Sequence, residues 1–411
     1  MTDIELRTID IALSKLDRHS GSGRILLPRL GTGGGFADIF FWDTVFTAMW
    51  AVYHRDALPV FASLDNLYRL QERSGLINRQ YLPNGDPKWS SDHPIAVAPP
   101  VLAWAELEMY SHTHDRDRLR RVFGPLVRHH GFVVRFLRGE DGLYFSDPLG
   151  CGMDNLPRWP RSGRFDDGGI AFSARYVRGD PTEFLANPAL SWNRQARWID
   201  ISSQMALDAW CLAEIAAVLG ESEEEASRRA EHERLAELIN ALMWDEGLGG
   251  YVDRLADDPR QELGSDRRID RLHVGGFWPL IARVATAERA ERLAGHLNDE
   301  ATFGTPVPVP SLARNDPDFD PAGGYWRGAS WAPTTYMVLR GLSAYGFDRL
   351  ARRLAERAYE AVVAVYRDTG TIWENYSSVR PEAGSPPAQP DFCGWSGLYT
   401  VTLPREYLDR G

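Results

Sequence analysis

Two kinds of predicted helix alternate along the chain, and this alternation restricts the possible folds more than any other feature. The even-numbered helices are apolar on nearly every face, as in residues 205–215, and the odd-numbered ones carry an apolar stripe and a charged face, as in residues 347–357. A helix that is apolar all round must be buried, whereas a striped helix can cover it from outside. The sequence therefore predicts an all-α fold, an (α/α)6 toroid with six inner and six outer helices.

Helical periodicity, with Pro near helix starts and Gly after helix ends, gives the predicted boundaries. A Gly124-Pro125 pair should break the fifth helix into two pieces. The predicted helices cover residues 3–18, 41–54, 59–73, 99–112, 115–138, 201–219, 223–243, 276–285, 287–297, 331–344, 347–367 and 394–403.

The connections are also asymmetric. Those that enter the even-numbered helices are long and rich in Gly, Pro and aromatic residues, whereas those that leave them have only a few residues. In an alternating toroid all the long loops open on one face, and loops of this length usually carry function. Residues 1–411 are accordingly expected to form a single catalytic domain with one long loop excursion at 139–200. The long loops are 19–40, 74–98, 139–200, 244–275, 298–330 and 368–393.

Composition excludes several classes of protein. The formal net charge of −11 makes nucleic acid and an anionic membrane surface poor partners. No apolar run approaches the roughly 20 residues needed to span a bilayer, and the first residues contain acids and no apolar signal core, so a cytoplasmic protein is expected. Three scattered cysteines predict neither disulfides nor a zinc site. We expect no metal and no cofactor, and oligomeric state is not readable.

One acidic segment resembles the start of a calcium-binding loop. Asp316, Asp318 and Asp320 alternate as such a loop requires, but Pro321 and Arg327 stand where it needs Gly and Glu. The segment is therefore expected to bind no metal.

Aromatic residues recur at the starts of the even-numbered helices, and the chain contains 14 Trp. Trp42, Trp278, Trp326 and Trp395 all occupy such positions. These residues could form a sugar-binding funnel at the mouth of the toroid, or they could fill its core.

Two carboxylates lie in loops that lead into even-numbered helices, so both should reach the same mouth. Asp154 stands in a segment rich in Gly and Pro, and Glu374 stands between Trp373 and Tyr376. Asp154 could instead close an Asx turn, and Glu374 could be a surface residue. Two carboxyl groups that face each other across an aromatic cleft are the arrangement used for glycoside hydrolysis.

Four motifs make the chain resemble the (α/α)6 glycoside hydrolases of families 37 and 63, the trehalase and bacterial glucosidase clan. Residues 152–159, Gly-Met-Asp-Asn-Leu-Pro-Arg-Trp, resemble the clan's acid motif, and residues 373–376, Trp-Glu-Asn-Tyr, resemble its base segment with the later Gly-Trp stretch at 392–397. Residues 41–46 and 325–331 match in order and spacing. The match spans roughly residues 36–403.

This resemblance implies an inverting hydrolase that cleaves an α-glycosidic bond in a short carbohydrate, either a disaccharide or a glycosyl-glycerate. Asp154 is then the general acid and Glu374 the general base, about 6.5–9.5 Å apart. Each arginine in the site could instead be part of a structural ion pair. The substrate-binding residues that the resemblance implies are Phe41, Trp42, Asp43, Arg79, Asn155, Arg158, Trp326, Arg327, Trp331, Tyr376 and Trp395.

The neighbours of the two carboxylates suggest different environments. Asp154 is close in sequence to Met153 and Leu156, which favours its protonated form. Glu374 is followed by Asn375 and Ser377, a more polar setting that suits an ionised base.

The chain departs from the clan pattern in two places. The clan's acid motif is commonly preceded by Glu-Ser, but Gly150 and Cys151 occupy those positions. A proline-rich stretch at 381–390 replaces the Gly-rich segment that trehalases have after the base. Alternative functions are another (α/α)6 carbohydrate enzyme, such as a lyase or an epimerase, an isoprenoid-type transferase, and a non-catalytic helical scaffold. A scaffold of that kind should show a regular repeat and short loops, and neither is found.

Overall fold

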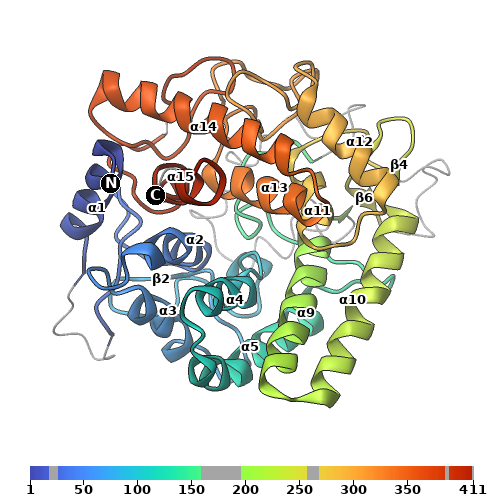
Figure 1. Cartoon of the computed structure of the whole chain (residues 1–411). Coiled ribbons are helices and arrows are strands. Elements are labelled where there is room, and N and C mark those ends of the chain that lie inside the picture. Colours follow the sequence, from blue (N-terminus) through green and yellow to red (C-terminus); the bar gives the residue numbers. More distant parts are fainter. Residues whose placement is uncertain (18–25, 159–195, 257–267, 385–387, 410–411) are drawn as a thin grey trace.

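The computed structural model describes residues 1–17, 26–158, 196–256, 268–384 and 388–409 (Figure 1). Six inner segments form a closed ring, because each one contacts the next and the last contacts the first. In ring order they are α2 (Phe41–Ala51), α4 (Leu102–Thr113), α9 (Ile199–Leu219), α11 (Trp278–Ile281), α13 (Ala332–Ala344) and the π-helical turn η4 (Leu398–Thr402) with α15 (Leu403–Tyr407).

The outer layer alternates with this ring, so the predicted all-α toroid is confirmed. Burial separates the two layers as expected: nearly the whole of α9 is buried, whereas only Leu235 and Ile239 are buried in α10. The outer helices are α1 (Asp3–Ser14), α3 (Val60–Arg69), α5 (Arg116–Leu137), α10 (Ser222–Leu242), α12 (Ala287–Asn298) and α14 (Asp348–Thr369).

Two predicted helix boundaries are wrong. α5 is continuous through Pro125 instead of breaking there. Proline removes the hydrogen bond to the carbonyl four residues earlier, which belongs to Arg121, and this residue is exposed, so water can replace the lost bond. The eighth predicted helix is also much shorter, since it consists of the 3-10 turn η3 (Val274–Phe277) and the single turn α11.

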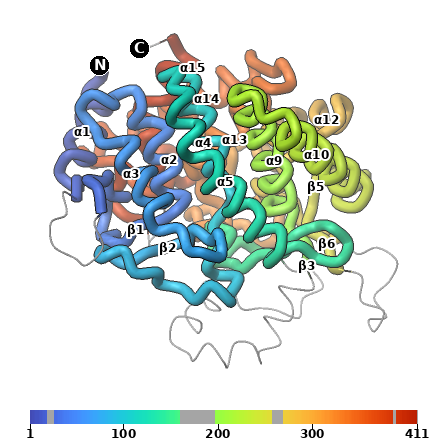
Figure 2. Tube along the Cα trace, turned by 90° about the horizontal axis from the view of Figure 1, so that it is seen from below, coloured from blue at the N-terminus to red at the C-terminus, as the bar shows by residue number. Residues whose placement is uncertain are grey.

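Short strand pairs tie the long loops together at one end of the helices. Figure 2 shows β1, β2, β3 and β6 gathered below the helical layer. All three pairs are antiparallel: β1 (Ile39–Phe40) with β2 (Gln80–Tyr81), β3 (Ala196–Arg197) with β6 (Arg254–Leu255), and β4 (Trp244–Asp245) with β5 (Gly250–Tyr251).

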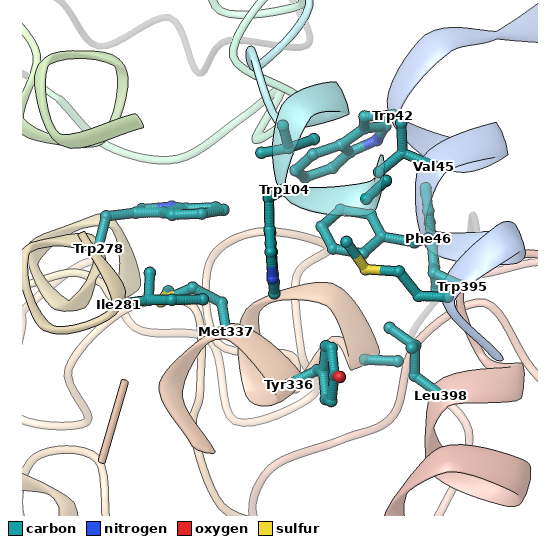
Figure 3. Close-up of a cluster of buried hydrophobic side chains, with 14 of the residues drawn as sticks. Trp42, Val45, Phe46, Trp104, Trp278, Ile281, Tyr336, Met337, Trp395 and Leu398 are labelled. Carbon is teal, nitrogen blue, oxygen red and sulfur yellow. The ribbon is translucent and has the colours of Figure 1, made fainter. Parts of the chain in front are cut away.

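Aromatic side chains fill the axis of the ring (Figure 3). Trp104 stands at the centre, with Tyr336 stacked on it at a centroid distance of 5.9 Å and Trp278 perpendicular to it at 6.3 Å. Phe46 connects this cluster to Trp42. Aromatic pairs in these geometries add about 0.5–1.5 kcal/mol each beyond the area they bury. This cluster fills the ring's interior, so the inner helices leave room for a ligand toward their ends, where both described pockets lie.

One buried ionic group joins an inner helix to two outer ones. His130 of α5 contacts Asp208 of α9 at 2.7 Å and Glu231 of α10 at 3.0 Å. Burial alone would lower the pKa of His130, but the hydrogen bonds to the two carboxylates outweigh it and raise this pKa to about 9. His130 is therefore an imidazolium at neutral pH.

Replacing this imidazolium should destabilise the fold strongly. We expect His130→Leu to lower the free energy of unfolding by about 3–5 kcal/mol, because the buried Asp208 carboxylate loses the imidazolium that hydrogen-bonds it, while Glu231 retains its ion pair with Arg228. Urea unfolding at pH 7 measures the change. Arg120→Ala on the same helix removes an exposed ion pair with Asp117 and should cost less than about 1 kcal/mol. If the two variants lost equal amounts of unfolding free energy, the buried ionic group around His130 would not stabilise the fold more than an exposed ion pair does.

Candidate active site

A cleft of about 480 Å³ lies among the long loops at one end of the ring. Its walls combine aromatic side chains with carboxylates, an arginine and a lysine. A concave site with a few convergent polar groups is the usual form of a small-ligand site. The lining residues are Gly35, Phe36, Ala37, Asp38, Phe40, Trp42, Asp43, Arg79, Gln80, Lys88, Trp89, Leu149, Gly152, Asp154, Tyr325, Trp326, Glu374 and Trp395.

Glu374 is held by four hydrogen bonds in the segment that precedes η4. The hydroxyl of Tyr325 donates to its Oε1 at 3.1 Å, and the backbone N–H of Gln389 donates to its Oε2 at 3.1 Å. Its own backbone N–H donates to the Gln389 carbonyl, and the indole N–H of Trp395 donates to its carbonyl. The carboxyl group is therefore fixed in orientation on the cleft wall.

The environment of Glu374 differs from the predicted one. The residue is only 2% exposed, and burial raises its pKa to about 7, although the Gln389 N–H and the Tyr325 hydroxyl act in the opposite direction. The expectation of a polar setting is wrong because Asn375 and Ser377, which suggested it, are themselves fully buried.

Asp154 lies on a turn that approaches the indole of Trp42 closely. Gly152 has φ +75°, and a Cβ at this position would lie 2.7 Å from the Trp42 ring, so only glycine fits. Burial raises the pKa of Asp154 to about 6, while the charge of Arg79 lowers it. Both candidate catalytic carboxyl groups can thus change protonation near neutral pH.

A third carboxyl group, Asp43, lies in the first turn of the inner helix α2. Burial and the charge of Glu374 together raise its pKa to about 8. Asp43 is therefore mostly protonated at pH 7 and can donate a hydrogen bond as well as accept one.

Asn155 links the acid-bearing turn to the loop before α13. Its side-chain amide donates to the Gly324 carbonyl at 2.9 Å, and its Oδ1 accepts from the Trp326 N–H at 2.8 Å. These two bonds enclose Tyr325, whose φ of +63° is unusual for a bulky residue. Asn155, which follows Asp154 in sequence, therefore fixes the backbone of Tyr325, and the Tyr325 hydroxyl in turn donates to Glu374.

The aromatic wall is built from three inner helix starts. Trp326 stacks on Trp331 at a centroid distance of 4.0 Å with ring planes 2° apart. The ring centroid of Trp42 lies 6.2 Å from that of Trp326 and 5.9 Å from that of Trp395. Trp331 is fully buried behind Trp326. The same residues therefore line the cleft and extend the core.

Of the residues predicted to form the site, some line the cleft and some lie behind it. Those on the wall are Trp42, Asp43, Arg79, Asp154, Trp326, Glu374 and Trp395. Those outside the lining are Phe41, Asn155, Arg158, Arg327, Trp331 and Tyr376. Trp159, the last residue of the acid motif, falls outside the described residues, as does 159–195 of the long excursion.

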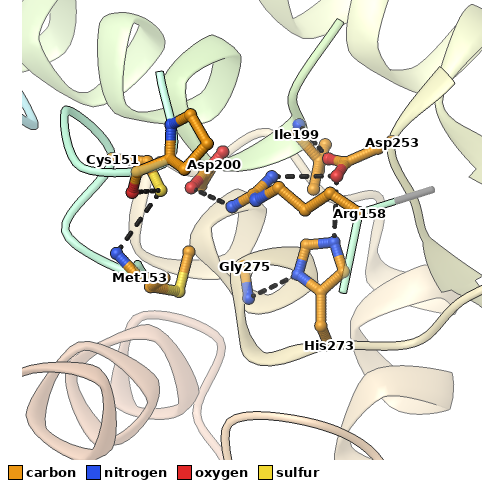
Figure 4. Close-up of polar contacts among 9 residues, drawn as sticks. Cys151, Met153, Arg158, Ile199, Asp200, Asp253, His273 and Gly275 are labelled. Carbon is orange, nitrogen blue, oxygen red and sulfur yellow. Dashed lines mark hydrogen bonds and ion pairs between the residues drawn. The ribbon is translucent and has the colours of Figure 1, made fainter. Parts of the chain in front are cut away.

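Arg158 belongs to a buried ionic network (Figure 4). Its guanidinium contacts Asp200 at 2.5 Å and Asp253 at 2.8 Å, and it lies 4.2 Å from the centre of the Trp198 ring. His273 contacts the same Asp253 carboxylate at 3.3 Å. The structure thus places Arg158 in a set of paired charges behind the acid-bearing turn.

The segment 316–327 was expected to contribute Arg327 to substrate binding and to hold no metal ion at its three aspartates. The Arg327 Nε donates to the Asp318 carbonyl, and Arg271 contacts both Asp316 and Asp318. Within the described residues, no group of three or more His, Cys, Asp or Glu side chains is arranged to hold a metal ion. The same residues contain no helix that is long and apolar enough to cross a membrane.

Two residues of the cleft wall, Lys88 and Trp89, were not predicted from the sequence, whereas the neighbouring Arg79 was. Lys88 and Arg79 flank the Trp89 ring at 6.0 Å and 5.4 Å. Arg79 donates to the Leu149 carbonyl, and Lys88 pairs with Asp38 at 3.1 Å. The signal that could have found Lys88 and Trp89 is their position in the long loop 74–98.

The closed ring and the cleft with the carboxyl groups of Asp154 and Glu374 define the class of the protein, which is an (α/α)6 glycoside hydrolase. Residues 39–396 match the family described as "Mannosylglycerate hydrolase MGH1-like glycoside hydrolase domain". The chain belongs to this family. The predicted resemblance to the family 63 and trehalase clan is confirmed.

Relatives of known sequence and structure are similar over most of the chain. Mannosylglycerate hydrolase MGH1 of Selaginella moellendorffii is 38% identical, over 82% of this chain and 74% of the relative. Mannosylglycerate hydrolase of Rubrobacter radiotolerans is 26% identical, over 80% and 83%. The chain covers 62% of an uncharacterized relative from Borreliella burgdorferi. A crystal structure of the GH63 mannosylglycerate hydrolase of Thermus thermophilus has a TM-score of 0.73 at 21% identity, covering 97% of this chain and 99% of that one.

The hydroxyl of Tyr325 should set the ionisation of Glu374. We expect Tyr325→Phe to raise the pKa of Glu374 by about half a unit to one unit, because one hydrogen bond to the charged form is lost. A carbon-13 NMR titration of glutamate carboxyl groups measures this pKa, with Glu374→Gln identifying the signal. Tyr345→Phe, which removes a hydroxyl bonded to the Ala285 carbonyl, is the control and should leave the titration unchanged. An unchanged titration in Tyr325→Phe would contradict the assignment.

Proposed function

We propose that residues 1–411 form one catalytic domain that hydrolyses the α-glycosidic bond of a glycosyl-glycerate with inversion, with Asp154 as general acid and Glu374 as general base. The observation that carries this proposal is that the buried Glu374 and the half-buried Asp154 come from different loops, line one cleft and have pKa values raised to about 7 and about 6. An inverting glycosidase needs such a pair on opposite faces of the sugar ring.

The reaction moves two protons and breaks one bond. Asp154 donates its proton to the glycosidic oxygen as the bond to the anomeric carbon breaks. Glu374 accepts a proton from the water that attacks this carbon from the opposite face. Asp154 is then ionised and Glu374 protonated, and exchange with solvent restores both groups. Because their pKa values are about 6 and about 7, this exchange is easy near neutral pH.

The cations of the cleft support a leaving group that carries a carboxylate. Arg79 and Lys88 both line the cleft, and Arg79 acts electrostatically on Asp154. A glycerate leaving group carries one negative charge, which pairs well with a charged donor. Two similar proteins are described as mannosylglycerate hydrolases, which supports the same choice of substrate. A neutral disaccharide would make no use of this charge.

Separate tests of the two carboxyl groups distinguish their roles. We expect Asp154→Asn to lower kcat on mannosylglycerate by about 10²–10⁴-fold, because nothing then protonates the leaving oxygen. It should retain far more activity on α-mannosyl fluoride, whose leaving group scarcely needs a proton. Glu374→Gln should impair both substrates comparably, because the water must be activated in either case. Steady-state kinetics on the two substrates measure the contrast.

The reverse pattern would exchange the two roles. If Asp154→Asn lost the fluoride reaction completely while Glu374→Gln retained it, Asp154 would be the base. Proton NMR of the first-formed sugar tests inversion, and a retained anomeric configuration would show that Glu374 acts as a nucleophile instead.

Lys88 should distinguish the charged leaving group from a neutral one. We expect Lys88→Met to raise KM for mannosylglycerate about tenfold, since a charge-assisted hydrogen bond at this partly exposed position is lost. KM for the neutral mannosylglycerol should change much less. The control is Lys15→Met, which removes the only other lysine of the sequence and should leave both values unchanged. Equal changes of KM for the charged and the neutral substrate would contradict the glycerate assignment.

A further inference from the structure

A buried aspartate that has no part in the proposed reaction lies on the turn that carries the acid. Asp147 is 1% exposed. Its Oδ1 accepts from the backbone N–H groups of Leu149 at 2.9 Å and Gly150 at 3.2 Å, and its carbonyl accepts from the Cys151 N–H at 2.8 Å. These bonds close the turn that leads directly into Asp154.

The second carboxylate oxygen of Asp147 is not used by the turn. Oδ2 is buried and has no hydrogen-bond partner. A buried charged oxygen without a partner costs more free energy than a neutral group in the same place. Asn would satisfy the same two N–H groups through its Oδ1 without that cost. The negative charge at position 147 is therefore not needed to close the turn.

The neighbouring position, Gly150, has no room for a side chain. A Cβ on Gly150 would lie 2.9 Å from the Val97 carbonyl oxygen, 3.2 Å from the Pro94 carbonyl oxygen and 3.4 Å from the Asp147 Cβ. No side chain fits there without a shift, and the space beside it holds the side chain of Asp147. The turn thus carries a carboxylate from position 147 and none from position 150.

We propose that Asp147 is a positioning residue for the acid catalyst, because it closes the turn that presents Asp154 and holds a second carboxyl group, with one unpaired oxygen, in the same loop segment. This proposal rests on the proposed function, in which Asp154 must be protonated when substrate binds.

The charge of Asp147 and that of Arg79 act on Asp154 in opposite directions. Asp147 raises the pKa of Asp154, and Arg79 lowers it. Burial raises the pKa of Asp147 itself to about 6, although the N–H groups of Gly150 and Leu149 and the charge of Arg79 act in the opposite direction. The group is therefore ionised above neutrality. Asp147 is therefore charged in the pH range where Asp154 would otherwise lose its proton. The other titratable groups that interact with Asp154 are Asp43, Glu374, Tyr325 and Cys151.

Asp147→Asn tests this role, because it keeps the turn and removes the charge. Above both pKa values, kcat/KM follows the fraction of Asp154 that is still protonated, and below both it follows the fraction of Glu374 that is ionised. We expect the ratio of kcat/KM at pH 8 to that at pH 5, measured on mannosylglycerate, to fall at least about threefold. The ratio on α-mannosyl fluoride should stay unchanged, because the leaving fluoride scarcely needs the acid.

Asp141→Asn is the matched control. Asp141 also accepts a hydrogen bond from a backbone N–H, that of Leu143, through Oδ1, and its buried Oδ2 also has no hydrogen-bond partner. Its carboxylate differs in that it pairs with Arg197 at 2.8 Å and does not act on Asp154. The ratio of kcat/KM at pH 8 to that at pH 5 should be the same in Asp141→Asn as in the wild type.

The proposal would be overturned if folded Asp147→Asn protein kept the wild-type ratio of kcat/KM at pH 8 to that at pH 5. It would also be overturned if Asp141→Asn lowered this ratio as much as Asp147→Asn does. If Asp147→Asn does not fold, Asp147→Ser keeps an oxygen for the turn, and the same two outcomes apply. Failure of the proposed function gives a different result, because Asp154→Asn would then still hydrolyse mannosylglycerate.

Discussion

The packing of aromatic side chains around Trp104 on the ring axis is the constraint on which the rest of the structure depends. Tyr336 and Trp278 meet at this residue from two other inner segments, and Phe46 joins them from a third. Because protein interiors are packed as densely as organic crystals, such a cluster leaves no channel along the axis. Polar groups that act on a ligand must then lie at the ends of the ring. The long loops all reach one of those ends, and the cleft forms there.

The same packing determines the chemistry of the cleft. Trp42 and Trp395 belong both to the buried cluster and to the cleft wall, so the carboxyl groups stand on an apolar floor. Burial is the largest cause of the raised pKa of Asp43, Asp154 and Glu374. A carboxyl group on the protein surface has a pKa near 4, so only about one in a thousand would carry a proton at pH 7, whereas a pKa of about 6 leaves about a tenth of Asp154 protonated. The core that stabilises the toroid therefore also tunes its catalytic groups. A second pocket, whose lining includes Trp104, Glu108, Arg340 and Glu406, differs from the cleft, because its two carboxylates are paired with Arg340.

The fold and the two candidate catalytic residues could be predicted from the sequence, because they depend on patterns along the chain. Apolar periodicity separates inner from outer helices, and loop length indicates the functional end. The environment of each residue depends instead on contacts between distant segments. Glu374 has polar neighbours in sequence, yet these neighbours are buried and Gln389 and Tyr325 surround its carboxyl group. Arg158 resembles a substrate ligand by its motif, but Asp200 and Asp253, far along the chain, bind its guanidinium.

Two hydrogen bonds of Asn155 connect the segment that carries Asp154, the proposed acid, to the residue that hydrogen-bonds Glu374, the proposed base. Asn155 follows the acid and holds the carbonyl before Tyr325 and the N–H after it, while the Tyr325 hydroxyl bonds Glu374. The positive φ of Tyr325 costs about 1–3 kcal/mol, and such a conformation persists only where its surroundings impose it. The two hydrogen bonds of Asn155 supply that constraint. Misplacement of a reacting group by about 1 Å can cost about 10²-fold in rate, so a rigid link between the two carboxyl groups has direct catalytic value. The strain at Tyr325 is thus the structural cost of fixing Asp154 and Glu374, the proposed acid and base, in one geometry before substrate arrives.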